Sequence, residues 1–268
     1  MKKMIQRIKS SELDSQKLSQ IMTCIDDELE DFDFSKVVVN KPWGYEYLMY
    51  KTDDVSIWVL CLKKGCMTSM HCHIDKKTSL LVLSGEAVCS TLEGGVKLKE
   101  GEGLTLDKKV FHSTQAVSDE ELIMIEVETP TKKIDVLRLL DSYGRETKGY
   151  EGQEHMSNLK EFEMVNFQVG EFNKEKKLGS FSLSLEKFEE ENKIFEFLKT
   201  DPYSLAIILD GRMINKATGE LFEIADVFYH NNMESIDSYR FEKSLTILKI
   251  KNINKVNFYE KTTKSSFV

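Results

Sequence analysis

Three of the five histidines in this 268-residue chain fall within two short segments. His71 and His73 lie two residues apart in "GCMTSMHCHIDKKTSLLVLSG", and His112 ends "GEGLTLDKKVFH". Alternate side chains of a β-strand point to the same side, so the first two can face one ion while His112 reaches it from another strand. Imidazole binds zinc, manganese, iron and nickel. The spacing therefore predicts a divalent-metal centre whose metal the histidines alone do not select.

These residues need a β framework, and short runs of strand-forming residues supply one from residue 37 onward. Turn clusters of Gly, Lys, Asp or Ser separate the runs "VSIWVLCL", "SLLVLSG", "EAVCSTL", "GLTL" and "ELIMIEVE". Closely spaced short strands are typical of antiparallel sandwiches or barrels and not of alternating strand–helix units. We therefore predict a mainly β fold.

A helix is predicted before this framework, over residues 10 to 33. Apolar side chains recur there at helical spacing, and Ser11 with Asp14 has the pattern of a capping box. Residues 1–36 are accordingly predicted to form an N-terminal helical segment.

The second half of the chain shows weak signs of an internal repeat. Its predicted strands are "GSFSLSLEKF", "YSLAIILDG", "LFEIADVFY" and "SLTILKIKNI". "SLLVLSGEA" is similar to "SLAIILDGRM", and Gly101 to His112 has the same length as Gly219 to His230. We predict a metal-binding domain over residues 37–150 and a degenerate second copy over 151–268. His230 has no His-x-His pair beside it, so we predict no metal ligand there.

Bulk composition excludes several classes of function. The net charge is −8, from 37 basic and 45 acidic residues, which argues against nucleic-acid binding because that needs a basic face. No stretch approaches the roughly 18 apolar residues of a membrane span. The five cysteines are an odd number, and the N-terminus lacks the apolar run of a secretion signal. We expect a cytoplasmic protein with reduced thiols.

The histidine segments resemble the two motifs of the cupin superfamily. Thr78 stands where the first motif has Glu, and Asp107 and Lys109 stand where the second has Pro and Gly. The remaining motif positions match at Gly65, His71, His73, Gly85, Gly101 and His112. "KPWGYE" and "IEVETPTKKIDVLRLLDSYGR" are similar to the entry and exit segments of the type II phosphomannose isomerase-like cupins. The resemblance implies an antiparallel β-barrel of the jelly-roll type, in a bicupin whose second barrel is degenerate.

The same resemblance implies an activity and roles for residues. It implies a metal-dependent isomerase or epimerase, similar to mannose-6-phosphate isomerase, acting on a phosphorylated or nucleotide-linked sugar in surface polysaccharide biosynthesis. His71, His73 and His112 would hold zinc, manganese or iron. Arg145 would bind the phosphate, assisted by Lys41 and Lys109, and either Glu46 or Glu126 would be the base. Because cupins commonly associate through strands and flanking helices, we expect a homodimer.

Thr78 leaves two other functions open. The missing carboxylate position could be filled by water, by substrate or by Asp75. Three histidines without a carboxylate also resemble the iron sites of thiol dioxygenase cupins, which would make the chain an iron dioxygenase. A third possibility is a non-catalytic cupin that binds a sugar or stabilises a partner enzyme.

Overall fold

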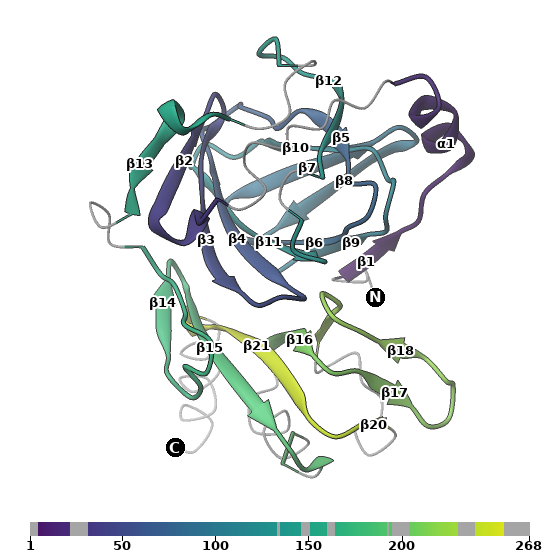
Figure 1. Ribbon diagram of the computed structural model, residues 1–268, viewed down its shortest axis with the longest axis vertical. Helices are drawn as coiled ribbons and strands as arrows, with labels where there is room; N and C mark the ends of the chain where they lie inside the picture. The colour runs from purple at the N-terminus through teal and green to yellow at the C-terminus, as the bar shows by residue number, and fades with distance from the viewer. Residues whose placement is uncertain are drawn as a thin grey trace, which may run out of the picture. The chain divides into compact units, whose positions relative to one another are not determined.

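The computed structural model divides by contacts into two compact units, Met1–Val169 and Gly170–Val268. It describes residues 5–21, 32–132, 135–145, 151–159, 164–191, 193–194, 204–229 and 239–254 (Figure 1). The boundary between the units lies later than the predicted one after residue 150, because β13 (Met156–Asn158) pairs with β2 (Val37–Lys41) in the first unit.

The first unit consists of two sheets, as the jelly-roll prediction requires. The eight-stranded sheet has the order β1-β9-β6-β11-β4-β3-β2-β13, and the five-stranded sheet has the order β12-β5-β10-β7-β8. All pairings are antiparallel except that of β1 with β9. The strands not yet bounded are β1 (Ile5–Ile8), β3 (Gly44–Lys51), β4 (Ser56–Leu62), β5 (Met70–Cys72), β6 (Lys77–Ser84), β7 (Glu86–Thr91), β8 (Gly94–Lys99), β9 (Gly103–Leu106), β10 (His112–Ala116), β11 (Leu122–Thr129) and β12 (Leu137–Leu140).

The apolar core of this unit lies between the two sheets. One cluster combines residues of both, including Leu80, Val82 and Met124 from the larger sheet and Ala87 and Cys89 from the smaller. Such burial of apolar surface is the main stabilising contribution to a two-layer fold. The described cysteines, which are Cys61, Cys66, Cys72 and Cys89, are free thiols.

The "KPWG" segment makes a tight turn between β2 and β3. Gly44 has φ +151, and a Cβ placed on it would lie 1.9 Å from the carbonyl oxygen of Cys61 on β4. Only glycine allows β3 and β4 to approach this closely. Trp43, one residue earlier, is buried, so the turn holds its indole in the protein interior.

Among the described residues of the predicted N-terminal helix, the helical stretch ends after Leu18. The helix α1 spans Glu12–Leu18, with the predicted capping box between Ser11 and Asp14 present. Residues 19–21 form a turn, and residues 22–31 of the predicted helix lie outside the described residues. A 3₁₀-helix, η2 (Phe34–Lys36), then leads into β2. The β1 strand was not predicted. In the structure, Asp14 accepts a hydrogen bond from the backbone of Phe111 (2.9 Å) and so anchors α1 beside His112.

The second unit is also built from antiparallel strands. Its sheets have the orders β14-β15-β21-β16-β19 and β18-β17-β20. The predicted strand "LFEIADVFY" is two strands of different sheets, because the chain turns at Ala225 with φ +68. The bounds are β14 (Lys176–Leu178), β15 (Phe181–Phe188), β16 (Ser204–Asp210), β17 (Met213–Asn215), β18 (Leu221–Phe222), β19 (Val227–Tyr229), β20 (Tyr239–Phe241) and β21 (Leu245–Asn252).

The two units share one strand order, which supports the predicted repeat. The series β9-β6-β11-β4-β3 corresponds to β19-β16-β21-β15-β14, and β8-β7-β10 corresponds to β18-β17-β20. Gly85 and Gly211 follow equivalent strands with φ +82 and +83. The predicted match of Gly101 with Gly219 is wrong. The N–H of Ala225 donates to Ile208 O of β16 (2.8 Å), as the N–H of Gly101 donates to Val82 O of the equivalent strand β6 (2.9 Å), whereas the N–H of Gly219 donates to Asn215 O of β17.

In the described part of the chain, no helix has the length and apolar character needed to cross a bilayer.

Candidate metal centre and charged pocket

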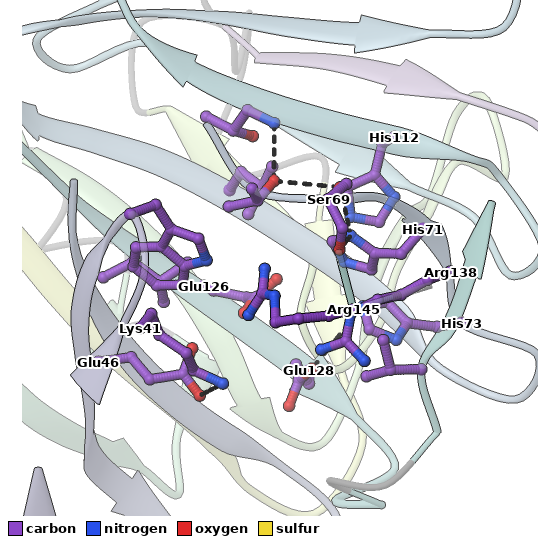
Figure 2. A pocket seen from close by; sticks show the side chains of 16 residues that line it. Lys41, Glu46, Ser69, His71, His73, His112, Glu126, Glu128, Arg138 and Arg145 are labelled. Carbon is purple, nitrogen blue, oxygen red and sulfur yellow. Dashed lines mark hydrogen bonds and ion pairs between the residues drawn. The ribbon is translucent and has the colours of Figure 1, made fainter. Parts of the chain in front are cut away.

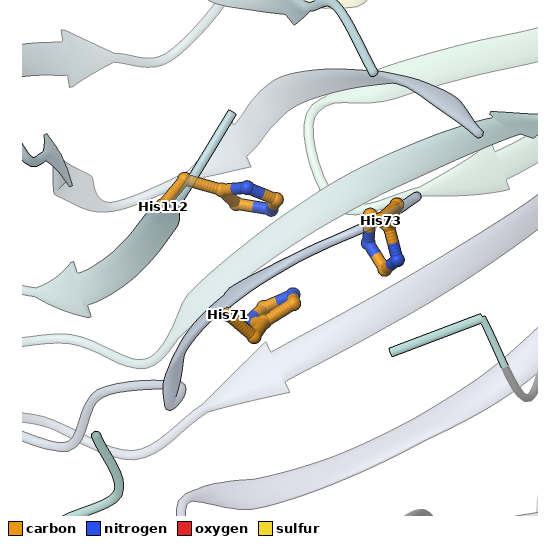
Figure 3. Close-up of side chains that lie close together, drawn as sticks. All are labelled: His71, His73 and His112. Carbon is orange, nitrogen blue, oxygen red and sulfur yellow. The ribbon is translucent and has the colours of Figure 1, made fainter. Parts of the chain in front are cut away.

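The three predicted histidines converge on one side of the smaller sheet (Figure 3). His112, the first residue of β10, lies directly opposite His71 of β5, and opposite residues of an antiparallel pair share a face. His73 follows two residues after His71 and faces the same way. The ring centroids are 4.5 Å (His71–His112), 5.1 Å (His71–His73) and 5.6 Å (His73–His112) apart.

Backbone carbonyls orient all three rings. Nδ1 of His71 contacts the carbonyl of Ser69 at 2.8 Å, that of His112 contacts the carbonyl of Val110 at 3.0 Å, and that of His73 contacts the carbonyl of Asp135. A carbonyl oxygen can only accept, so each Nδ1 carries the proton and each Nε2 keeps its lone pair. Metal-binding histidines in proteins are held by the same kind of contact.

The donor set fits a divalent metal. One ring nitrogen of each histidine lies within 4.8 Å of the others. Nε2 of His73 and of His112 is buried and has no hydrogen-bond partner among the described residues, although buried polar atoms are normally paired. Coordination of an ion would satisfy both nitrogens. The residues present therefore suit a metal bound through three neutral imidazoles.

The protonation of the histidines is consistent with this role. Burial, and after it the neighbouring His112, lowers the pKa of His71 well below its ordinary value. Burial and the positive charge of Lys76 do the same to the pKa of His73, and burial lowers the pKa of His112. Neutral imidazole is the form that binds metals.

The histidines form one wall of a pocket with an accessible volume of about 60 Å³, enough for an ion and a few water molecules. Figure 2 shows acidic and basic side chains around it. Both predicted bases, Glu46 and Glu126, line the pocket and are buried. Glu126 belongs to a second group of possible metal ligands with His73 and Glu128, whereas Glu46 lies 3.5 Å from Nζ of Lys41.

The two predicted phosphate-binding residues, Lys41 and Arg145, are brought together in this pocket. Both are buried, and both form ion pairs with the carboxylate of Glu151. Arg145 also pairs with Asp141 at 2.8 Å. Burial alone would raise the pKa of Glu151, but the charge of Lys41 lowers it below its ordinary value. A carboxylate of the protein thus occupies the position between the two cationic groups.

Two other predicted residues lie elsewhere. Lys109 does not line the pocket; its side chain is exposed, while its backbone N–H donates to the carbonyl of His73 at 2.7 Å. Its φ of +68 explains why the related motif has glycine at this place. Asp75 points away from the histidines: its half-exposed carboxylate lies 3.5 Å from Lys132.

Several buried charges at the site were not singled out from the sequence. Asp135 accepts hydrogen bonds from the backbone N–H groups of Ile74, Asp75 and Lys76, and so shapes the loop after His73. Arg138 of β12 lies opposite His71. The others are Lys76, Glu128 and Glu151. The signal that could have found Glu128 is its place two residues after Glu126 on a strand, which gives both the same face.

Comparisons with known proteins give partial structural matches only. The sequence matches no family model and no curated protein sequence. Solved structures that are similar include the capsular polysaccharide assembling protein CapF from Staphylococcus aureus, at 20% identity and a TM-score of 0.36, covering 41% of this chain and 36% of that one. A sugar phosphate isomerase from a cupin superfamily of Silicibacter pomeroyi matches at 13% identity and a TM-score of 0.33, covering 41% and 76%.

KdgF from Halomonas sp. matches at 15% identity and a TM-score of 0.33, covering 40% of this chain and 94% of that one. The chain spans about a third of the length of the CapF chain that it matches. These likenesses concern part of the fold, and they say nothing about the reaction of this protein.

Proposed function

We propose that this chain is a metal-dependent cupin that isomerises or epimerises a phosphorylated or nucleotide-linked sugar. The observation that carries the proposal is the convergence of three histidine ring nitrogens beside a pocket that also contains carboxylates and three buried cationic groups. A divalent ion held by His71, His73 and His112 would polarise a carbonyl oxygen of the sugar as a Lewis acid.

The pocket's own residues have distinct parts in such a reaction. Glu126 is the better candidate base, because its carboxylate lies within 4.8 Å of a ring nitrogen of His73, one of the residues that would hold the metal. In an isomerisation, Glu126 would remove the proton from the carbon next to the carbonyl and return it to the former carbonyl carbon, while the proton of the adjacent hydroxyl would move to the former carbonyl oxygen. In an epimerisation, a water molecule would supply the proton on the opposite face.

The anionic group of the sugar would bind Lys41 and Arg145. Guanidinium and ammonium groups bind phosphate oxygens through charge-assisted hydrogen bonds. The carboxylate of Glu151 already occupies this position, so a phosphate would have to displace it. Arg145 would position the substrate, and it would not exchange a proton.

Proton exchange in D₂O tests the proposal. The purified protein, loaded with zinc, is incubated with a panel of hexose phosphates and sugar nucleotides, and loss of the C2 proton signal is followed by NMR. We expect exchange in the wild type, and a loss of at least about 100-fold in Glu126→Gln. Absence of exchange with every sugar phosphate and sugar nucleotide, or oxygen uptake by iron-loaded protein, would contradict it. Glu46→Gln provides the comparison between the two carboxylates.

A further inference from the structure

Position 78, where the resembling motif has a carboxylate, is buried and polar in this chain. The hydroxyl of Thr78 has no hydrogen-bond partner among the described residues. Thr78 lies on β6 directly opposite Glu128 of β11. Opposite side chains of an antiparallel pair lie about 4.5–5.5 Å apart at Cβ. The carboxylate missing from position 78 is therefore present one strand away, on the same face of the sheet.

Glu128 is close enough to share an ion with His73, which also belongs to the group of three histidines. Its Oε1 lies 3.9 Å from Nε2 of His73. Two ligand atoms that each lie about 2.0–2.2 Å from one ion are at most about 4.3 Å apart, so one ion can contact both. Asp75, the alternative from the loop, points to solvent and pairs with Lys132.

Two buried side chains hold Glu128 in this orientation. Nζ of Lys76 lies 2.5 Å from Oε1, and Oγ of Ser56 lies 3.3 Å from Oε2. The ammonium group offsets the cost of burying the carboxylate. Each carboxylate oxygen has two lone pairs, so Oε1 can bind an ion while it accepts from Lys76. Ligating carboxylates are commonly hydrogen-bonded in this way.

A short neutral residue such as Thr78 is compatible with a carboxylate at the opposite position, Glu128. A glutamate at position 78 would place a second carboxylate directly opposite Glu128, and like charges at opposite positions are destabilising. A short neutral side chain there removes the repulsion.

We propose that Glu128 is the carboxylate ligand of this metal centre, in place of the acid that position 78 lacks. The inference rests on the metal centre of the proposed function and deepens it, because it adds an acidic ligand beside His73. Lys76 is a positioning residue for that acid.

Zinc affinity, measured by equilibrium dialysis against a competing chelator, tests the assignment without any activity assay. We expect Glu128→Gln to weaken zinc binding by at least about 10-fold. The double variant Thr78→Glu/Glu128→Gln returns the carboxylate to position 78, and we expect its affinity to come within a few-fold of the wild type. Asp75→Asn is the matched control, with unchanged affinity. Circular dichroism checks the fold of each variant.

The substitution of Glu128 alone leaves the ammonium group of Lys76 buried without this partner, which could unfold the protein. Lys76→Met/Glu128→Gln removes both charges, and we expect it to lose zinc affinity as Glu128→Gln does. Wild-type affinity in this variant or in Glu128→Gln would overturn the assignment. If Glu128→Gln loses zinc affinity and the added Thr78→Glu does not restore it, the idea that Glu128 replaces a carboxylate at position 78 would be overturned. A wild-type protein that binds no zinc, manganese or iron would instead refute the metal centre itself.

Discussion

The two units use the same strand order for different interiors. On the inward face of β11, Leu122 and Met124 precede Glu126 and Glu128, while the corresponding face of β21 has Leu245 and Ile247 followed by Lys249 and Lys251. Strand register gives this correspondence: Thr78 pairs with Glu128 as Ser204 pairs with Lys251, and a bulge occurs at the same place in both pairs of strands.

The difference lies at one end of the strands, beyond a shared apolar core. Among the described residues of the second unit, Asp226 is the one buried charged side chain, whereas the first unit buries charges of both signs around its histidines. Lysines at the positions of Glu126 and Glu128 would repel a cation. In both units the centres of these strands are apolar, whereas the residue types at the strand ends differ and can serve different functions.

The largest expected difference between the units is their response to metal. Zinc at a concentration of about 1,000 times its dissociation constant should stabilise the first unit against unfolding by about 4 kcal/mol. Hydrogen exchange measured by mass spectrometry should show slower exchange in β5 and β10 and no change in β17 and β21. His73→Ala should abolish the effect. Equal protection of both units would contradict the assignment of the metal to the first.

Because each unit has an apolar core at corresponding positions, we predict that equivalent core substitutions destabilise the two units equally. Leu122 and Leu245 are each fully buried at the same register position. Substitution of either by alanine should lower the unfolding free energy of its own unit by about 2–5 kcal/mol. Hydrogen exchange measured at increasing urea concentrations gives the unfolding free energy of each unit separately. A large effect at one position and none at the other would show that the two cores are packed differently.

The two glycines that follow the equivalent bulges, Gly85 and Gly211, should differ slightly in the cost of their replacement by alanine. Both adopt left-handed conformations, but a Cβ on Gly211 would lie 2.4 Å from the carbonyl oxygen of Ser244, while one on Gly85 would first meet the hydroxyl of Ser118 at 2.7 Å. A side chain can rotate away and a backbone carbonyl cannot. We expect thermal denaturation to show a cost of about 1–3 kcal/mol for each alanine variant, with Gly211→Ala the worse. The reverse order would contradict this reasoning.

The smallest expected effect concerns acid sensitivity. The pKa of Glu151 is lowered from its ordinary 4.5, because its pairing with Lys41 outweighs the effect of burial. Its contribution to the stability of the first unit is therefore present above about pH 4.5 and is lost as the pH falls through the lowered value. Glu151→Gln should make the acid limb of a stability–pH curve shallower. An unchanged limb would show that the ion pairs of Glu151 contribute nothing there.

The strands, the capping box and the convergence of the three histidines could be predicted because each rests on local spacing. His71 and His73 are neighbours on a strand, so a two-residue period places them on one face. Glu151 could not be assigned in this way, because its contact with Lys41 joins residues 110 positions apart. The same two-residue period places Glu128 on the face of Glu126, but its position opposite Thr78 depends on the register of β6 against β11, which no local pattern specifies. The helical periodicity also did not reveal that α1 ends after Leu18, where a turn follows.

The bond between Lys41 and Glu151 also bears on how the first unit folds. It closes a loop of 110 residues, and long-range contacts form late because the entropy of closing the chain must first be offset by other contacts. The pocket that contains Lys41 and Trp43 should therefore reach its final form after the sheets have paired. Stopped-flow refolding of Trp58→Phe, which leaves Trp43 as the one indole of the chain, should show native fluorescence only in the last phase. If so, an intact pocket would indicate that the first unit has folded completely.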